Sequence, residues 1–281
     1  MNKLMWLIKF LKKFSLTGKI SLIIIILITL IAVFAPFVSP YPPDKSSGPA
    51  LEQPQAQHIM GTDDLGYDIW SQIAYGARIS LIIGIGTALF ASFGGGIIGI
   101  ISAYKGGCLD KILMRIIDIM IVLPDLPLMI ILAAFFGPSL INIILVLTFL
   151  SWIRPARIVR SQVLMLKEME YIKSAKSYGA GSWYLLKNHF LPEIFPLLAV
   201  SMIRLSSKAI VAEAGLSFLG LGDPTSKSWG LIIHHASNFK GIYYTPFWKW
   251  WLLFPWFALL SLIISLAFIS RELEDLYSLK R

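Results

Sequence analysis

ISLIIIILITLIAVFAPFV, residues 20–38, is a run of 19 residues without a charged side chain. Such a run is long enough to cross about 30 Å of hydrocarbon as an α-helix, so it predicts a transmembrane helix and excludes a soluble protein with buried helices. Lys12, Lys13 and Lys19 precede the run, as basic residues precede the core of a signal peptide. The run is too long for such a core, and no Ala-x-Ala cleavage site follows it. We therefore expect a retained first helix.

The composition extends this conclusion to the whole chain. Of 281 residues, 56% are hydrophobic and 15% are charged, and the mean hydropathy is +0.71. We expect an all-α integral membrane protein with six transmembrane helices, at residues 20–38, 79–103, 112–136, 138–160, 194–221 and 249–270. The predicted parts are a cytoplasmic N-terminal segment (1–19), the first transmembrane helix (20–38), an extracytoplasmic segment with a short amphipathic helix (39–78), a core transmembrane domain (79–270) that includes a cytoplasmic loop (161–192), and a cytoplasmic tail (271–281).

The distribution of basic residues predicts the orientation. Eighteen of the 25 Lys and Arg residues fall on one side of the six-helix arrangement. Cytoplasmic loops of membrane proteins are enriched in these residues, so both termini and the central loop are expected in the cytoplasm. The net charge of +9 then reflects topology and contact with anionic lipid headgroups, and no nucleic-acid partner is expected. The single cysteine, Cys108, lies in a predicted cytoplasmic turn and cannot form a disulfide within the chain.

Several ionisable residues lie inside the predicted spans, where such groups are functional candidates by default. Arg115 and Asp118 are three residues apart on one helix face, which favours a local ion pair. Lys208 and Glu213 are poorly spaced to pair on one ideal helix, so each needs another partner or water. The candidates for positions that face a wet path across the membrane are Asp125, Arg204, Lys208 and Glu213.

Residues 167–192 form a polar, basic and helix-forming insert between two long apolar segments. Gly179 interrupts the insert midway, and Leu191-Pro192 follows twelve residues later. The spacing resembles the cytoplasmic loop of permeases of ATP-binding-cassette (ABC) importers. In those permeases an acidic-Ala-Ala triplet, three residues and the glycine precede Leu-Pro. Here the triplet falls on residues 173–175, Lys-Ser-Ala, and departs from the pattern at its first two positions.

This resemblance implies that a separate ATPase grips the loop. We expect Gly179 in a turn between two cytoplasmic helices, because glycine tolerates positive φ, with residues 180–187 as the coupling helix. Trp183, Leu185 and Leu186 would insert into a groove on the ATPase; the alternative is that the loop lies on the membrane surface. The residues expected at this contact are Ser174, Ala175, Gly179, Ala180, Trp183, Leu185, Leu186, Leu191 and Pro192.

A basic stripe lies where the fourth span leaves the membrane. It consists of Arg154, Arg157 and Arg160, which follow one another at steps of three residues. Lipid headgroups and the ATPase are alternative partners for this stripe.

Residues 58–81 resemble the signature of the second permease subunit of dipeptide, oligopeptide and nickel importers. That family reads His-x-Leu-Gly-Thr-Asp-x-x-Gly-Arg-Asp-x-x-Ser-Arg and then Tyr-Gly-Ala-Arg-x-Ser-Leu. The chain has Tyr67 and Gln72 where the family usually has arginine, so two positive charges are missing from the expected outer face. It keeps Gly61, Thr62, Asp63, Gly66, Asp68, Ser71, Tyr75, Gly76, Ala77, Arg78 and Ser80.

The outer segment is expected to dock a substrate-loaded, extracytoplasmic binding protein. Residues 39–57 are typical of an extended linker, and Asp63 or Asp64 can cap a short amphipathic helix along the outer interface. With Asp68, these acidic residues predict a basic patch on the partner. The alternative is a structural plug against a partner permease. The residues expected at the docking contact are Gly61, Thr62, Asp63, Gly66, Asp68 and Trp70.

Residues 212–222 and 228–230 match a second block of the same family, Glu-Ala-x-Leu-Ser-Phe-Leu-Gly-Leu-Gly followed by Ser-Trp-Gly. The resemblance implies a type I ABC importer permease fold in the inner membrane of a prokaryote. It also implies a second homologous permease subunit and two ABC ATPase subunits that bind ATP and Mg. The cargo would be peptides, nickel or nickel chelates. A stand-alone secondary transporter or channel is the alternative, but we find no internal repeat or carboxylate constellation that favours it.

The chain itself is not expected to be an enzyme or to bind a cofactor. No Gly-x-x-x-x-Gly-Lys-Ser/Thr loop occurs, so no P-loop binds ATP. The neighbouring His234 and His235 lack a third ligand, so no metal site is expected.

Overall fold

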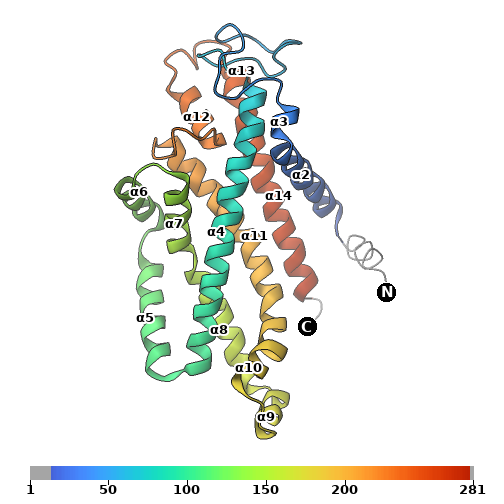
Figure 1. Cartoon of the computed structure of the whole chain (residues 1–281), viewed down its shortest axis with the longest axis vertical. Coiled ribbons are helices and arrows are strands. Elements are labelled where there is room, and N and C mark those ends of the chain that lie inside the picture. The colour runs from blue at the N-terminus through green and yellow to red at the C-terminus, as the bar shows by residue number, and fades with distance from the viewer. Residues whose placement is uncertain (1–13, 279–281) are drawn as a thin grey trace.

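The computed structural model describes residues 14–278 of the chain, with side chains to residue 276, and this part is built from helices (Figure 1). Residues 14–278 contain no β-strand, although Thr62 and Asp68 form an isolated bridge. The helices are α2 (Leu16–Val33), α3 (Ala35–Val38), α4 (Ile69–Lys105), α5 (Gly107–Val122), α6 (Asp125–Phe136), α7 (Leu140–Ser151), α8 (Ile153–Glu168), α9 (Glu170–Ser177), α10 (Ser182–Leu185), a π-helical turn (Leu186–Phe190), α11 (Leu191–Phe218), α12 (Trp229–Asn238), α13 (Trp248–Trp251) and α14 (Leu253–Ser278).

Five helical stretches in the described part of the chain are long and apolar enough to cross a membrane. They are Leu16–Val33, Ile69–Lys105, Leu140–Glu168, Ser182–Phe218 and Trp248–Leu276. Helices α5 and α6 meet the same criterion together, although they are bent by 95° at their junction. Counted as one broken span, this pair brings the number of candidate spans to six and agrees with the prediction of an all-α membrane protein with six spans.

The third predicted span, 112–136, is not one straight helix. Helix α5 ends at Val122, and Leu123 and Pro124 adopt extended conformations before α6 begins at Asp125. Proline lacks a backbone N–H and disfavours the helical conformation of the residue before it, which explains the break. As a result, Asp125 lies in the first turn of α6, where the positive end of the helix dipole stabilises a carboxylate.

Helix α4 is 37 residues long and contains both the second predicted span and the end of the outer segment. The prediction of a separate amphipathic helix along the outer interface is therefore wrong. Asp68, rather than Asp63 or Asp64, caps the helix: its Oδ2 accepts hydrogen bonds from the Ser71 N–H at 2.8 Å and the Ser71 hydroxyl at 2.7 Å. Nothing interrupts the helical pattern after this cap, so the helix continues directly into the membrane span.

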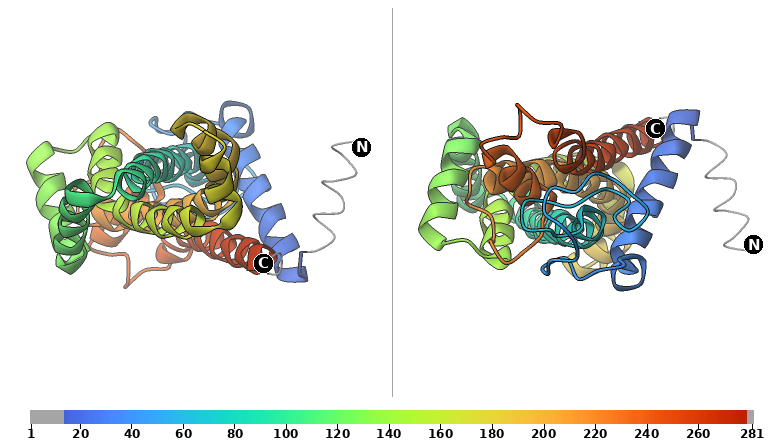
Figure 2. Two further views of the ribbon diagram at one scale, coloured as in Figure 1. Left: turned by 90° about the horizontal axis from the view of Figure 1, so that it is seen from below. Right: turned by 90° about the horizontal axis from the view of Figure 1, so that it is seen from above.

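The centre of the bundle is the packing of α4 against α8 and α11. Gly95 and Gly99 make the approach of α8 possible, because a Cβ at either position would collide with the α7–α8 backbone at Trp152 or Ala156. Helices α5 and α6 lie at one edge of the bundle and α2 at the opposite edge (Figure 2). The segment 39–68 covers one end of α4, and α9 and α10 lie at the other end of the molecule (Figure 1).

Candidate functional site

Two neighbouring cavities lie along α11 at the level of the candidate spans. The larger has a volume of about 510 Å³ and is lined by four charged residues, Arg154, Arg204, Lys208 and Glu274, together with Pro155, Ile158, Leu197, Val200, Ser201 and Leu205. The smaller, about 130 Å³, shares Arg154, Leu205 and Lys208 with the first and adds Asp125. Charged side chains from α6, α8, α11 and α14 thus meet around one continuous surface.

Two ion pairs connect helices at these cavities. Lys208 Nζ of α11 lies 2.5 Å from Asp125 Oδ2 at the start of α6, and Arg204 of α11 pairs with Glu274 of α14. The side chains of Lys208 and Asp125 are still 37% and 45% exposed, so the packing of the chain does not close off either of them. Three of the four predicted path-facing residues therefore line the cavities, and their role in a path stays a prediction.

Glu213, the fourth candidate, lies elsewhere. Its side chain is 1% exposed, and its Oε1 accepts a hydrogen bond from the Ser217 hydroxyl at 2.6 Å. A Cβ at Gly230 of α12 would collide with the backbone of Ala214, so α12 packs directly on this part of α11. The prediction that Glu213 faces a wet path is therefore wrong, because the α11–α12 junction covers the carboxyl group.

The basic stripe on α8 has partners within the chain. Arg157 pairs with Asp118, and Arg160 forms a bidentate pair with Asp110 at 2.6 and 2.7 Å. Both acidic residues belong to α5, so these pairs hold α5 to α8. The prediction of a local pair between Arg115 and Asp118 is wrong, because an arginine of the neighbouring helix takes the Asp118 carboxylate. Arg157 and Arg160 therefore each have a carboxylate partner on α5, and the prediction of lipid headgroups or an ATPase as partners of the stripe stays a prediction.

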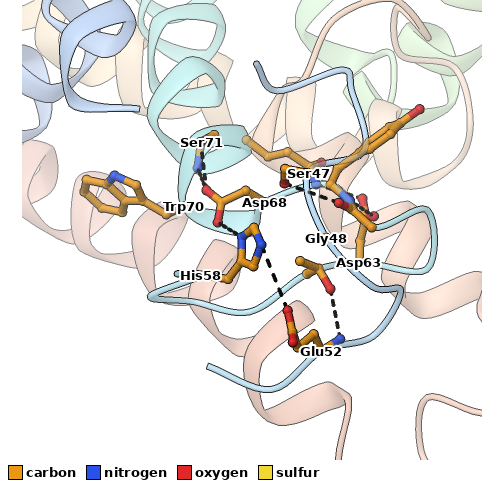
Figure 3. Close-up of polar contacts among 12 residues, drawn as sticks. Ser47, Gly48, Glu52, His58, Asp63, Asp68, Trp70 and Ser71 are labelled. Atoms are coloured by element: carbon orange, nitrogen blue, oxygen red, sulfur yellow. Dashed lines mark hydrogen bonds and ion pairs between the residues drawn. The ribbon is translucent and has the colours of Figure 1, made fainter. Parts of the chain in front are cut away.

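The N-terminal end of α4 is covered by a folded cap, residues 39–68 (Figure 3). His58 Nδ1 lies 3.0 Å from Asp68 Oδ1, and its Nε2 lies 4.0 Å from Glu52 Oε2. His58 and Asp68 are each 1% exposed. The carboxylate that caps α4 therefore also anchors the loop in front of it, which fixes the cap to the helix. Residues 39–57, predicted as a linker, are part of this fold.

Asp63 is the second buried carboxyl group of the cap. Its Oδ1 accepts hydrogen bonds from the backbone N–H groups of Leu65 and Tyr67, and its Oδ2 accepts one from Gln72 Nε2 at 2.7 Å. Burial raises the pKa of Asp63, and these hydrogen bonds oppose that increase. Gln72 is 3% exposed, so its departure from the family pattern changes the interior of the cap. The prediction that this position alters the outer face is wrong.

Most of the predicted docking residues are buried as well. Gly61, Thr62, Asp63, Gly66 and Asp68 lie inside the cap, and Trp70 is half-buried with its ring N–H donating to the Val38 carbonyl at 3.1 Å. These side chains form the cap and cannot themselves contact a partner, so that prediction is wrong for the five buried residues. A partner could instead reach Ile59, Asp64, Leu65 and Tyr244, which are exposed. The sequence signal for this surface was the presence of two aliphatic residues, Ile59 and Leu65, in a polar segment.

At the opposite end of the molecule, Gly179 lies in the turn after α9, as predicted. Its φ is +84°, and its N–H donates to the Lys176 carbonyl while the Ala180 N–H donates to the Ala175 carbonyl. These two bonds form a Schellman motif, which closes the C-terminus of a helix. Tyr104 of α4 donates a hydrogen bond to the Ser182 hydroxyl of α10 at 2.5 Å, so the loop is also tied to the end of α4.

The predicted coupling helix, 180–187, is shorter than expected. Helix α10 covers only Ser182–Leu185 and continues through a π-helical turn into α11. Leu185 is 1% exposed and packs in a core cluster, so its predicted insertion into an ATPase groove is wrong. Leu186 is partly buried against the same cluster. Trp183 is 72% exposed and remains free for a partner, and Tyr178, which we did not predict, is 93% exposed.

Comparison with known proteins gives consistent results along most of the chain. Residues 95–276 match the family described as "Binding-protein-dependent transport system inner membrane component", and residues 17–58 match "N-terminal TM domain of oligopeptide transport permease C". The chain is 37% identical over 260 residues to the dipeptide transport system permease protein DppC of Bacillus subtilis. This alignment covers 91% of the chain and 79% of that protein. It is 41% identical over 240 residues to the oligopeptide transport system permease protein OppC of the same organism, with 84% and 76% covered. A probable D,D-dipeptide transport system permease protein, DdpC of Escherichia coli, is 33% identical over 276 residues, with 98% and 90% covered.

Proposed function

Because the chain belongs to the family of binding-protein-dependent transport system inner membrane components, we propose that it forms one half of the path for peptides in an ATP-driven importer. The chain is a non-catalytic permease subunit. The observation that carries the proposal is the charged surface of the two cavities, where Asp125, Lys208 and Arg204 lie at the level of the spans. Ionisable groups at such depth face water or a partner rather than lipid. Membership of this family argues against the alternative of a stand-alone secondary transporter or channel.

A second, homologous permease is proposed to complete the path. The cavity residues are open on one side of the described chain, so six spans alone do not enclose a passage wide enough for a peptide. A pseudo-symmetric partner would cover this side and leave the charged groups in a shared, water-filled space. The remaining faces of α5 and α6 carry apolar side chains such as Ile119, Ile131 and Phe135 and suit the lipid bilayer.

The cytoplasmic loop is the proposed contact for one of two ABC ATPase subunits, which would bind ATP and Mg. Trp183 and Tyr178 are large exposed side chains next to the fixed turn at Gly179. Aromatic side chains of this kind serve as anchors in protein interfaces. In the proposed cycle, ATP binding brings the two permease loops together, and largely rigid-body motion turns the cavity from inward- to outward-facing.

The outer cap is the proposed docking surface for an extracytoplasmic binding protein that delivers the peptide. A buried polar core holds the cap together, and Ile59, Leu65 and Asp64 are exposed on it. A rigid surface is suited to a partner that must dock and leave in each cycle, because little conformational entropy is lost on binding. Under this proposal the cap lies outside the inner membrane of a prokaryotic cell and both termini lie in the cytoplasm.

The proposal is tested with the assembled complex in proteoliposomes. The chain is purified with its second permease, ATPases and binding protein, and uptake of a labelled peptide is measured with and without ATP and Mg. We expect uptake that requires ATP and the binding protein, with nickel ions taken up no faster than by empty liposomes. Peptide uptake that persists without ATP, or ATP-driven uptake of nickel but not of peptides, would contradict the proposal.

A further inference from the structure

Arg154 differs from every other charged residue around the two cavities. Among residues 14–278, Arg204 pairs with Glu274 and Lys208 pairs with Asp125, whereas Arg154 makes no hydrogen bond or ion pair. It also lines both cavities. Its two neighbours in the basic stripe are neutralised by α5, so Arg154 is the cation that this region leaves free.

Arg154 is the first charged residue of its candidate span. The candidate span that contains it runs from Leu140 to Glu168, and Arg154 is 14 residues from either end. At 1.5 Å per residue it lies about 21 Å along the helix from both ends. The apolar residues of this span belong to α7, and the charged residues begin with Arg154 in α8. Arg154 therefore lies at the charged end of an apolar stretch, where its ionised guanidinium lines both cavities and needs water, a partner or a ligand.

The charges around the joined cavities give one excess positive charge. The lining includes three cations, Arg154, Arg204 and Lys208, and two anions, Glu274 and Asp125. Since the two anions are already taken by the other cations, the excess charge belongs to Arg154. Guanidinium groups bind carboxylates through two parallel hydrogen bonds, a geometry that a lysine cannot reproduce.

The surface next to Arg154 is apolar. Ile158, Leu197, Val200 and Leu205 line the larger cavity, whose volume of about 510 Å³ lies in the range of small-molecule sites. A cation at the end of an apolar surface matches a solute with one carboxylate and aliphatic groups beside it. We infer that Arg154 binds the terminal carboxylate of the transported solute in the path, an inference that rests on the proposed function as a peptide permease.

The experiment compares tri-alanine with its C-terminal amide in the full complex. Leu197→Cys, in a Cys108→Ser background, places a thiol in the cavity, and its rate of labelling by a water-soluble maleimide reports occupancy. We expect tri-alanine to slow labelling and the amide to have little effect. Arg154→Gln should abolish the protection by tri-alanine and reduce its ATP-driven uptake about tenfold, as expected for the loss of one charge-assisted contact. Arg154→Lys should retain part of both effects.

Arg115→Gln is the matched control. Arg115 also has no ion pair among the described residues, but it lies outside both cavities. The substitution removes the same charge, so protection and uptake should stay at the parent level. Equal protection by acid and amide, or acid-specific protection that survives Arg154→Gln, would overturn the inference. Loss of uptake with unchanged protection would also overturn it, because Arg154 would then serve the contact between permeases. Absence of ATP-driven tri-alanine uptake by the parent complex would instead count against the proposed function.

Discussion

Replacing Gly179 by valine tests the coupling role of the cytoplasmic loop. Gly179 has a φ of +84°, and no atom lies within 4 Å of a Cβ added there. The substitution therefore causes no collision, and its cost is the left-handed backbone itself, about 1–2 kcal/mol for a residue with a Cβ. A β-branched side chain lies at the upper end of that range. A penalty of this size reduces the population of the native turn roughly 5- to 30-fold relative to its alternatives.

Gly181 provides the control. It lies two residues away with φ of −71° and equally open surroundings, so Gly181→Val should be tolerated. We expect Gly179→Val to insert into the membrane at normal levels while uptake per ATP hydrolysed falls several-fold. Gly179→Asn should recover much of the coupling, because asparagine tolerates the left-handed conformation. Normal coupling in Gly179→Val, or an equal loss in Gly181→Val, would refute the reasoning.

Three further predictions concern the cavities, the topology and the cap. Asp125→Cys and Lys208→Cys should react with aqueous maleimides in at least one nucleotide state, whereas Glu213→Cys should stay protected by the α11–α12 junction. The exposed native thiol of Cys108 should be labelled by an impermeant maleimide in inside-out vesicles and not in intact cells; the reverse result would contradict cytoplasmic termini. Burial raises the pKa of Asp63 above its ordinary value of 3.8, so its contribution to cap stability is full below that value and is lost as the pH rises through the raised pKa. Limited proteolysis of the cap should therefore speed up as the pH rises from acid to neutral, and Asp63→Asn should flatten the dependence.

The spans and the turn at Gly179 were predictable because their physical signals are local. An uncharged run of 19 residues has few alternatives to a membrane helix, and a glycine at the end of a polar helix suits a C-terminal turn. The break before α6 also has a local sequence signal, which is Pro124. The span was predicted from its mean hydropathy, and an average over a whole window is insensitive to a single proline. Proline disfavours the helical conformation of the residue before it, and this effect explains the 95° bend between α5 and α6.

The partners of charged residues were not predictable, because they depend on which helices become neighbours. The spacing of Arg115 and Asp118 allows a pair on one helix, but α8 brings Arg157 to the same carboxylate. The burial of Asp63 and Asp68 was not predictable for the same reason, because it depends on which segments pack together. Asp63 and Asp68 appear in a polar, proline-rich stretch that is typical of exposed loops, yet their carboxylates organise a cap. The residues that match a family pattern most closely can therefore be those that build a surface rather than those exposed on it.

The structure links the two ends of the proposed cycle through one element. Helix α4 has 37 residues and extends about 56 Å at 1.5 Å per residue. Asp68 fixes its N-terminal end to the cap, and Tyr104 near its C-terminal end is hydrogen-bonded to Ser182 at the start of α10, in the proposed coupling loop. Between these points Gly95 and Gly99 hold α4 in direct backbone contact with the α7–α8 segment, which carries Arg154 into the cavities. Because close-packed helices shift as units rather than bend, we expect a displacement of the loop by an ATPase to move the cap and the cavity wall together.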